Sequence, residues 1–320
     1  MLQQTQVDTV IPYFHRFLEK FPSLEVLAKA PIDDVLKTWE GLGYYSRARN
    51  LQKAAKCVLA SFNGNIPDDY MTLQSLPGLG PYCAAAIASI AFGKPIPVVD
   101  GNVLRVMSRF WGIESDIRHS KTRVIMFNRL KSYIETTHPS LFNQGMMELG
   151  ALICKPKSPK CGICPISSSC FAFKTGQIDR FPVKSKKSPV PHYDIGVGLI
   201  WKDNYLLIAK RKEDQMLGGL WEFPGGKKKE KETIEETVLR EIKEETALHV
   251  KLRSKLGVIK HAYSHFKITL HAFHCLYENG EPFSATSQEL RWVTFSDLKK
   301  YPFPSANKKM LGLMNEFLTF

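Results

Sequence analysis

Four cysteines fall within one short stretch of the chain, in the spacing C-x6-C-x2-C-x5-C: Cys154, Cys161, Cys164 and Cys170. Four thiolates this close in sequence can converge on one soft centre, either a structural zinc ion or a [4Fe–4S] cluster. A pair of disulfides is the alternative. The chain opens without the charged, apolar and cleavage regions of a secretory signal, so we expect a cytoplasmic protein with reduced thiols. The spacing therefore predicts a metal site, and it leaves zinc and iron–sulfur open.

The overall charge indicates what kind of partner the chain binds. The 320 residues carry a formal net charge of +13, which produces a field that attracts polyanions and weakens as salt is raised. Nucleic acid is the favoured partner, and a basic surface without a specific partner is the alternative. The longest apolar stretch, around residues 83–92, is too short to span a membrane. We expect a monomer that associates with DNA in the nucleoid and does not bind membranes.

The periodicity of apolar residues changes along the chain. From Leu2 to about Phe173 they recur three and four positions apart, which predicts an all-α region. Two β-rich runs at 195–201 and 205–209 then read as a hairpin, and a helix follows over about 230–246, so the second half is α+β. Prolines and basic residues between the halves suit an extended linker. The predicted division is a helical domain at 1–179, a linker at 180–193 and an α+β domain at 194–320.

Two short motifs precede the cysteines. Gly78 and Gly80 lie between two helical segments, where a tight hairpin can point backbone amides at a phosphate, although a plain interhelical turn fits the same residues. Asp100 and Asn102 lie where an apolar run ends and a helix begins. On pattern alone, either side chain reads best as the N-cap of that helix.

In this order, the helical hairpin, Val-Asp-Gly-Asn and the four cysteines resemble the endonuclease III superfamily of base-excision DNA glycosylases. The resemblance implies that the cysteines hold a [4Fe–4S] cluster. Within the superfamily, residues 1–7, residues 41–47 and the second domain are similar to the adenine DNA glycosylases, which hydrolyse the N-glycosidic bond of adenine mispaired with 8-oxoguanine or guanine. The resemblance covers nearly the whole chain and implies an enzyme of base excision repair that acts on double-stranded DNA.

The resemblance also implies roles at the reacting base. Tyr82 stands where strand-cutting members carry a lysine that forms a Schiff base, and a phenol cannot form that imine, so a monofunctional glycosylase is expected. Asp100 corresponds to the carboxylate that stabilises the cationic sugar, with Asn102 beside it. Glu148 matches a position linked to adenine recognition. Tyr82 and Glu148 each also suit a packing role.

Further residues correspond to those that read the lesion: Gln4, Tyr44, Ser264 and His265. Tyr44 resembles an aromatic wedge whose stacking offsets the unstacking of a flipped base. The alternative is that Tyr44 packs beneath Trp39. Four histidines nearby lack tight ligand spacing, so no zinc is expected there.

One expected group does not occur in the sequence. The family's catalytic acid is a Glu two residues before the Met that aligns with Met1, and residues 1–320 begin after it. We expect a start codon assigned too far downstream or a shortened chain, with part of the helical surface bare. Such a chain would bind lesion DNA and release adenine slowly, so a catalytically impaired lesion binder is an alternative function. A lyase acting on oxidised pyrimidines is opposed by Tyr82.

The second domain carries a Nudix-like box from Gly226 to Leu248 in which Ala247 replaces a glycine. Its acidic residues, spaced i, i+3, i+4, share one helical face and could bind Mg²⁺: Glu241, Glu244 and Glu245. A solvated helix face is the alternative. By resemblance this domain recognises 8-oxoguanine, and a DNA-tethered Nudix pyrophosphatase is a further alternative. The predicted fold is thus an all-α helix-hairpin-helix domain with a cluster loop, followed by a Nudix-like α+β domain.

Overall fold

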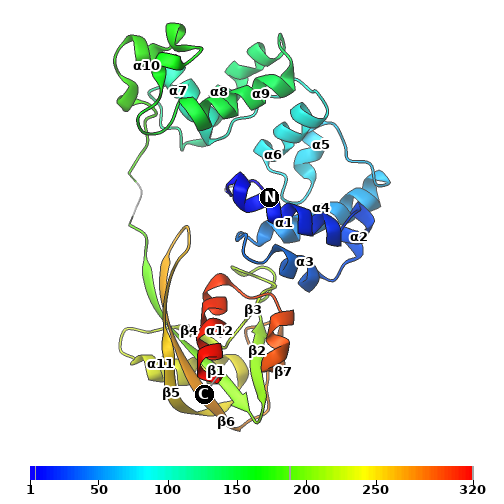
Figure 1. Ribbon diagram of the computed structural model, residues 1–320, viewed down its shortest axis with the longest axis vertical. Helices are drawn as coiled ribbons and strands as arrows, with labels where there is room; N and C mark the ends of the chain where they lie inside the picture. Colours follow the sequence, from blue (N-terminus) through cyan, green and yellow to red (C-terminus); the bar gives the residue numbers. More distant parts are fainter. Residues whose placement is uncertain (4, 187–188, 319–320) are drawn as a thin grey trace. The chain divides into compact units, whose positions relative to one another are not determined.

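The computed structural model describes residues 1–3, 5–186 and 189–318. They form two compact units: Met1–Leu59 together with Pro189–Phe320, and Ala60–Ser188 (Figure 1). The predicted helical and α+β classes are confirmed. The predicted domains at 1–179, 180–193 and 194–320 are continuous in sequence, whereas the first unit combines two separate segments. The predicted division stays a prediction.

The first unit begins with four helices: α1 (Val7–Lys20), α2 (Leu24–Lys29), α3 (Ile32–Trp39) and α4 (Ser46–Phe62). Their apolar faces meet around Trp39, whose ring lies edge-on to Phe17 at 5.8 Å between centroids. Helix α1 is apolar on two sides. It buries Val10 and Phe17, and it leaves a second row exposed: Val7, Ile11, Phe14 and Leu18.

The same unit contains a mixed sheet with the strand order β3-β2-β1-β6-β5, and β4 and β7 pair with β1 and β2. The strands are β1 (His192–Lys202), β2 (Tyr205–Lys210), β3 (Trp221–Glu222), β4 (Gly225–Lys227), β5 (His249–Ala262), β6 (Lys267–Asn279) and β7 (Glu289–Thr294). β1 and β2 form the predicted antiparallel hairpin, and β1 runs parallel to β6. β1 takes in the last two residues of the predicted linker.

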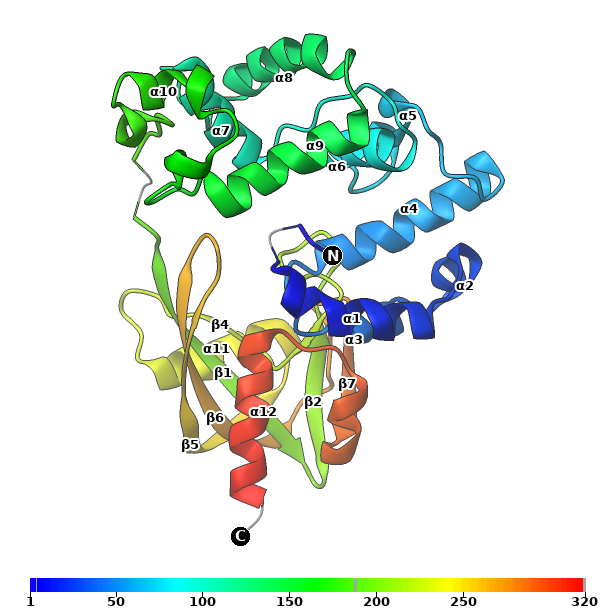
Figure 2. The ribbon, with the colours of Figure 1, turned by 45° about the horizontal axis from the view of Figure 1, so that its top comes forward.

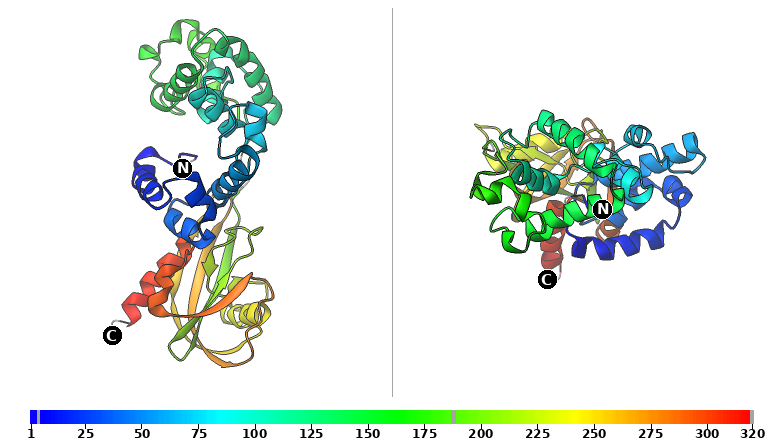
Figure 3. Two further views of the ribbon diagram at one scale, coloured as in Figure 1. Left: turned by 90° about the vertical axis from the view of Figure 1, so that its right-hand side faces the viewer. Right: turned by 90° about the horizontal axis from the view of Figure 1, so that it is seen from above.

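Helices cover both faces of this sheet, as Figure 3 shows. α11 (Ile234–Thr246) packs Val238 and Ile242 against one face, and α12 (Ser305–Leu318) packs Met310 and Met314 against the other. α11 begins four residues later than predicted, because Thr233 forms a reciprocal capping box with Glu236. The sheet and these two helices make the α+β core.

The N-terminal helices are fastened to the sheet by buried charges. Lys210 on β2 is only 8% exposed, and its Nζ lies 2.6 Å from Asp33 Oδ1 on α3. Asp33 Oδ2 also accepts a hydrogen bond from Trp221 Nε1 at 3.3 Å. Because an unpaired buried lysine is costly, these contacts explain why residues far apart in sequence form one unit.

The second unit is helical. It contains α5 (Tyr70–Ser75), α6 (Pro81–Ala86), α7 (Gly101–Trp111), α8 (Ser120–Ile134), α9 (Pro139–Glu148) and α10 (Phe171–Lys174), and α6 and α9 continue into the π-helical turns η1 (Ile87–Ala91) and η2 (Leu149–Ile153). Figure 2 shows α7, α8 and α9 grouped around one core, which holds Leu104, Met126 and Leu130. Within the described part of the chain, no helix has the length and apolar character needed to cross a bilayer.

The start of the predicted linker is bound to the second unit. The Asp116 carboxylate accepts a hydrogen bond from the Ser185 backbone N–H at 2.7 Å, and Arg118 donates to Ser185. Hydrogen bonds from the N–H groups of Arg118 and Ser185 hold the pKa of Asp116 at about 2. The chain is therefore anchored as far as Ser185.

A prediction follows from the end of α11, where Ala247 adopts φ 59°, ψ 11°. A left-handed conformation is unfavourable for a residue with a Cβ by about 1 kcal/mol and costs glycine little. Ala247→Gly should therefore raise the free energy of unfolding by up to about 1 kcal/mol, measured by urea denaturation. Ala60→Gly, on the exposed side of α4, is the control and should lower it. A loss of stability in Ala247→Gly would contradict the prediction.

Candidate functional site

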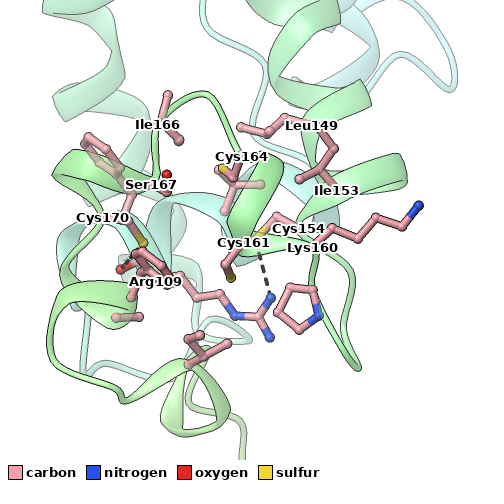
Figure 4. Close-up of a pocket in the computed structure, with 16 residues that line it drawn as sticks. Arg109, Leu149, Ile153, Cys154, Lys160, Cys161, Cys164, Ile166, Ser167 and Cys170 are labelled. Atoms are coloured by element: carbon pink, nitrogen blue, oxygen red, sulfur yellow. Dashed lines mark hydrogen bonds between the residues drawn. The ribbon is translucent and has the colours of Figure 1, made fainter.

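The four predicted cysteines line one cavity, together with apolar residues of α7 and η2 (Figure 4). Cys154 follows η2, Cys161 begins a 3-10 turn and Cys170 precedes α10. All four, within the described part of the chain, are free thiols rather than disulfides. Four thiols that line one cavity can hold a soft centre, either a zinc ion or an iron–sulfur cluster.

Arg109 on α7 ties this loop down. Its guanidinium donates to Lys155 O at 2.7 Å, to Phe181 O at 3.0 Å and to Cys154 Sγ at 3.3 Å (Figure 4). The side chain is 3% exposed. A cation beside thiolate ligands stabilises their negative charge, which fits an anionic cluster site. Burial raises the pKa of the Cys161 thiol, and the charges of the neighbouring cysteines raise it further.

Asp100 is the N-cap of α7, the structural role that the pattern favours. Its Oδ1 accepts from the Val103 N–H at 2.8 Å, and its Oδ2 accepts from Asn102 Nδ2 at 3.0 Å. The carboxylate is half-buried. Two charge-assisted hydrogen bonds fix its orientation, which also meets the requirement for a preorganised catalytic carboxylate. The cap and the predicted catalytic role are therefore compatible.

The Asp100 carboxylate is connected to the cysteine loop through Arg105. Arg105 Nη2 donates to Asn102 Oδ1 at 2.8 Å and to Gly150 O at 2.7 Å, and its Nε donates to Cys154 O at 2.8 Å. Gly150 packs so closely that an added Cβ would lie 2.5 Å from Asn102 Cβ. The orientation of Asn102 is thus set from two sides.

Tyr82 lies near this carboxylate. Partial burial, followed by the negative charge of Asp100, raises the pKa of the phenol. Its hydroxyl is 3.9 Å from Met147 Sδ on α9. Glu148, the next residue, is exposed at the end of α9. The structure therefore brings Tyr82 toward Asp100 and leaves the Glu148 side chain at the surface.

The predicted hairpin glycines sit between α5 and α6. Gly78 has φ 77°, a left-handed value that favours glycine, and Gly80 is the N-cap of α6. Pro81 occupies the first turn of α6, where its missing N–H costs nothing. The Leu79 N–H donates to Leu76 O at 3.1 Å, which closes the turn.

Sequence reasoning missed Asn143 on α9, which is 1% exposed. Its amide accepts from the Val98 N–H at 2.9 Å and donates to Ile96 O at 2.9 Å and Ser89 Oγ at 2.8 Å. These bonds hold the segment that leads to Asp100. Arg105 and Arg109 were missed as well. The available signal was two arginines four residues apart on a mainly apolar helix. Such arginines are buried with the helix and therefore need hydrogen-bond partners.

The predicted lesion-reading residues meet in the first unit. Tyr44 Oη and Ser264 Oγ are 2.7 Å apart, and both line a groove with His265 and Arg49. Ser264 and His265 lie in the turn between β5 and β6, and Tyr44 precedes α4. Gln4 lies outside the described residues.

The acidic residues of the Nudix-like box are already paired. Arg240 Nη1 contacts Glu241 at 2.7 Å and Glu244 at 3.0 Å, and Arg240 Nε contacts Glu232 at 2.5 Å. These bonds lower the pKa of Glu232 to about 2. Two of the three predicted ligands, Glu241 and Glu244, are paired with Arg240, and the Mg²⁺ site predicted at Glu241, Glu244 and Glu245 is not supported.

Glu245 faces a cavity of the same unit that Glu222 also lines. Burial is the main cause that raises the pKa of Glu245 to about 7, and the charges of Glu222 and Glu241 add to it. The Gly225 N–H donates to its Oε2 at 3.0 Å and partly offsets this rise. Glu222 itself forms a two-oxygen pair with Arg211.

Three parts of the chain match known protein families. Residues 1–132 match the HhH-GPD superfamily base excision DNA repair proteins, residues 154–170 the iron-sulfur binding domain of endonuclease III, and residues 196–313 the NUDIX domain. The loop of four cysteines is therefore an iron–sulfur site.

Curated relatives and a solved structure agree with these matches. The adenine DNA glycosylase of Rattus norvegicus is 33% identical over 99% of this chain and 70% of its own length. That of Buchnera aphidicola subsp. Baizongia pistaciae is 30% identical over 100% and 88%. A thermostable thymine-DNA glycosylase superposes with a TM-score of 0.50 and 28% identity, covering 54% of this chain and 80% of that chain.

The iron–sulfur site makes a prediction about metal content. Cys161→Ser should remove most of the bound iron and the broad visible absorbance, because serine oxygen is a poor ligand for this soft centre. Iron per chain is measured on protein purified without oxygen. Cys57→Ser, a half-buried thiol on α4, is the control and should retain its iron. Full iron content in Cys161→Ser would contradict the assignment.

The raised pKa of Glu245 makes a prediction about pH. The folded protein keeps this proton up to about pH 7, whereas the unfolded chain loses it near 4.5. Ionisation thus lowers stability progressively as pH rises between these values. Glu245→Gln removes the charge and keeps one oxygen that can accept from the Gly225 N–H, so it should stabilise the fold by about 1–3 kcal/mol at pH 8 and by much less at pH 4.5. Equal effects of the substitution on urea unfolding at both pH values would contradict this.

Proposed function

The chain belongs to the adenine DNA glycosylase family, and on that premise we propose that it removes adenine mispaired with 8-oxoguanine, or with guanine, from double-stranded DNA. It is a DNA glycosylase of base excision repair that hydrolyses N-glycosyl bonds. The observation that carries the specific proposal is the Asp100 carboxylate, held by Val103 and Asn102 beside Tyr82.

Asp100 supplies the charge that the reaction needs at the sugar. Loss of adenine leaves an oxocarbenium-like centre, which a fixed carboxylate stabilises without reorganising. Both Asp100 oxygens are held by hydrogen bonds, so the carboxylate keeps one orientation as positive charge develops. Asn102 has its own oxygen bound to Arg105, so its amide hydrogens remain directed at Asp100. Asn102 is therefore a positioning residue.

Tyr82 and Glu148 belong to the base side of the proposed site. The Tyr82 phenol cannot attack C1′ to form an imine, so the products are free adenine and an intact abasic strand. Tyr82 contacts Met147 and experiences the charge of Asp100, which suits a wall of the pocket that receives the flipped base. Glu148 would contact the base from the end of α9. The backbone amides around Gly78 and Gly80 would bind a phosphate of the same strand.

Tyr44, Ser264 and His265 form the proposed lesion-reading site, to which we also assign Gln4. Tyr44 is 43% exposed, which suits a side chain that stacks between bases. The hydroxyl of Ser264 and the imidazole of His265 offer hydrogen bonds to the edge of 8-oxoguanine. Their common groove supports this assignment.

We assign a [4Fe–4S] cluster to the four cysteines. The cavity that all four cysteines line and the match to the endonuclease III iron-sulfur domain support this form. When bound, the cluster supplies four metal–thiolate bonds that order the loop. Arg105 and Arg109 on α7 connect this loop to the helix through their hydrogen bonds to Cys154 O and Lys155 O.

The proposal is tested by single-turnover release of adenine from a duplex with adenine opposite 8-oxoguanine. The wild-type chain should release adenine and leave the strand uncut until alkali is added. Asp100→Asn should slow release by a factor of about 10²–10⁴, because the developing positive charge loses its counter-charge. Asp69→Asn is a matched control, because Asp69 caps α5 in the same way and its loss tests capping alone.

Three outcomes would count against the proposal. Equal losses in Asp69→Asn and Asp100→Asn would assign Asp100 to capping only. Strand cleavage without alkali would contradict the monofunctional reaction. Tight binding of the duplex by wild-type residues 1–320 without release would instead make these residues a lesion binder.

A further inference from the structure

The loop that carries Tyr44 has an unusual backbone. Gly41, Gly43 and Tyr44 have φ values of 108°, 69° and 47°. Three left-handed residues among four prevent the regular backbone hydrogen bonds of a helix or strand. For Tyr44 the left-handed conformation is also strained, because the residue has a Cβ. The loop therefore needs partners outside its own backbone.

Arg47, in the first turn of α4, provides most of them. Its Nη2 donates to Leu42 O and Gly43 O, each at 3.2 Å. Its Nη1 donates to Met1 O at 2.7 Å and to Gln3 O at 2.5 Å. One guanidinium thus joins the loop to the start of the chain.

Two aromatic rings complete the surroundings of this guanidinium. Its Cζ lies 5.4 Å from the Trp39 ring centroid and 5.3 Å from that of Tyr44. Trp39 Nε1 donates to the same Gly43 carbonyl at 3.1 Å. A planar fork can serve several acceptors and stack on rings at once, which a lysine ammonium cannot do.

We propose that Arg47 is the positioning residue of the Tyr44 wedge. It holds the left-handed loop and the first residues of the chain in one arrangement, so that the Tyr44 ring is presented to DNA without a prior ordering step. The inference rests on the proposed lesion-reading role of Tyr44. Preordering matters because the flexibility of an insertion loop is lost on binding, and small displacements of a positioned group have large effects on rate.

The first test measures the loop without substrate. Amide hydrogen exchange is followed by mass spectrometry in wild type, Arg47→Lys and Arg129→Lys. Arg129 is the matched control, because it also stacks on a tryptophan, Trp111, at 4.3 Å, but in the second unit. Arg47→Lys should speed exchange at least tenfold in residues 41–45 and leave α11 and β6 unchanged. Unchanged exchange in the loop would overturn the proposal.

The second test asks whether Arg47 acts through Tyr44. Single-turnover adenine release is compared for adenine opposite 8-oxoguanine and opposite guanine in Arg47→Lys, Tyr44→Ala and the double variant. Arg47→Lys should reduce the preference for 8-oxoguanine by about ten- to a hundredfold. In the Tyr44→Ala background the same change should have little further effect. Additive losses would overturn the proposal, because Arg47 would then act independently of the wedge.

The two tests separate this proposal from the proposed function. Wild-type protein that shows no preference for 8-oxoguanine would refute the proposed substrate. The exchange measurement would then still decide whether Arg47 orders the loop. Faster exchange throughout the first unit in Arg47→Lys would show general destabilisation and would also overturn a specific positioning role.

Discussion

The hydrogen bonds of two buried arginines on α7 hold the cysteine loop against this helix in the second unit. Arg105 and Arg109 reach carbonyl oxygens at Gly150, Cys154 and Lys155, in a segment that has no regular partner for them. Each bond satisfies a buried donor and an irregular backbone acceptor together, so removal of either side leaves the other unpaired. The iron–sulfur loop and the start of α7 at Asp100 are therefore parts of one hydrogen-bonded body.

The first unit uses the same chemistry for a different purpose. There the Arg47 guanidinium donates to two carbonyl oxygens of a loop without regular secondary structure, and the buried Lys210 pairs with Asp33 between β2 and α3. In both units, arginine side chains donate to backbone carbonyl oxygens that have no partner in a helix or strand. Part of the positive charge of this basic protein is therefore used to stabilise its own fold.

The sequence predicted the features that leave a local signature. The four cysteines, the cap at Asp100 and the shared face of the Glu241 helix each follow from spacing within a few residues. The contacts of Asn143 with Val98 and of Arg105 with Cys154 did not, because these partners lie more than 40 residues away and impose no periodicity. The pairing of Arg240 with three carboxylates also required coordinates, since the same residues could have faced a metal ion or solvent.

Gly150 is a position where a side chain would disturb the surroundings of Asn102. Its missing side chain lets η2 lie against Asn102 on α7, where Arg105 bonds both to Asn102 on its own helix and to Gly150 O. A methyl group at this position would force the two segments apart and break bonds on both sides of Asn102. The orientation of the proposed catalytic carboxylate thus depends on the absence of one side chain at Gly150, a residue to which no contact with the substrate is assigned.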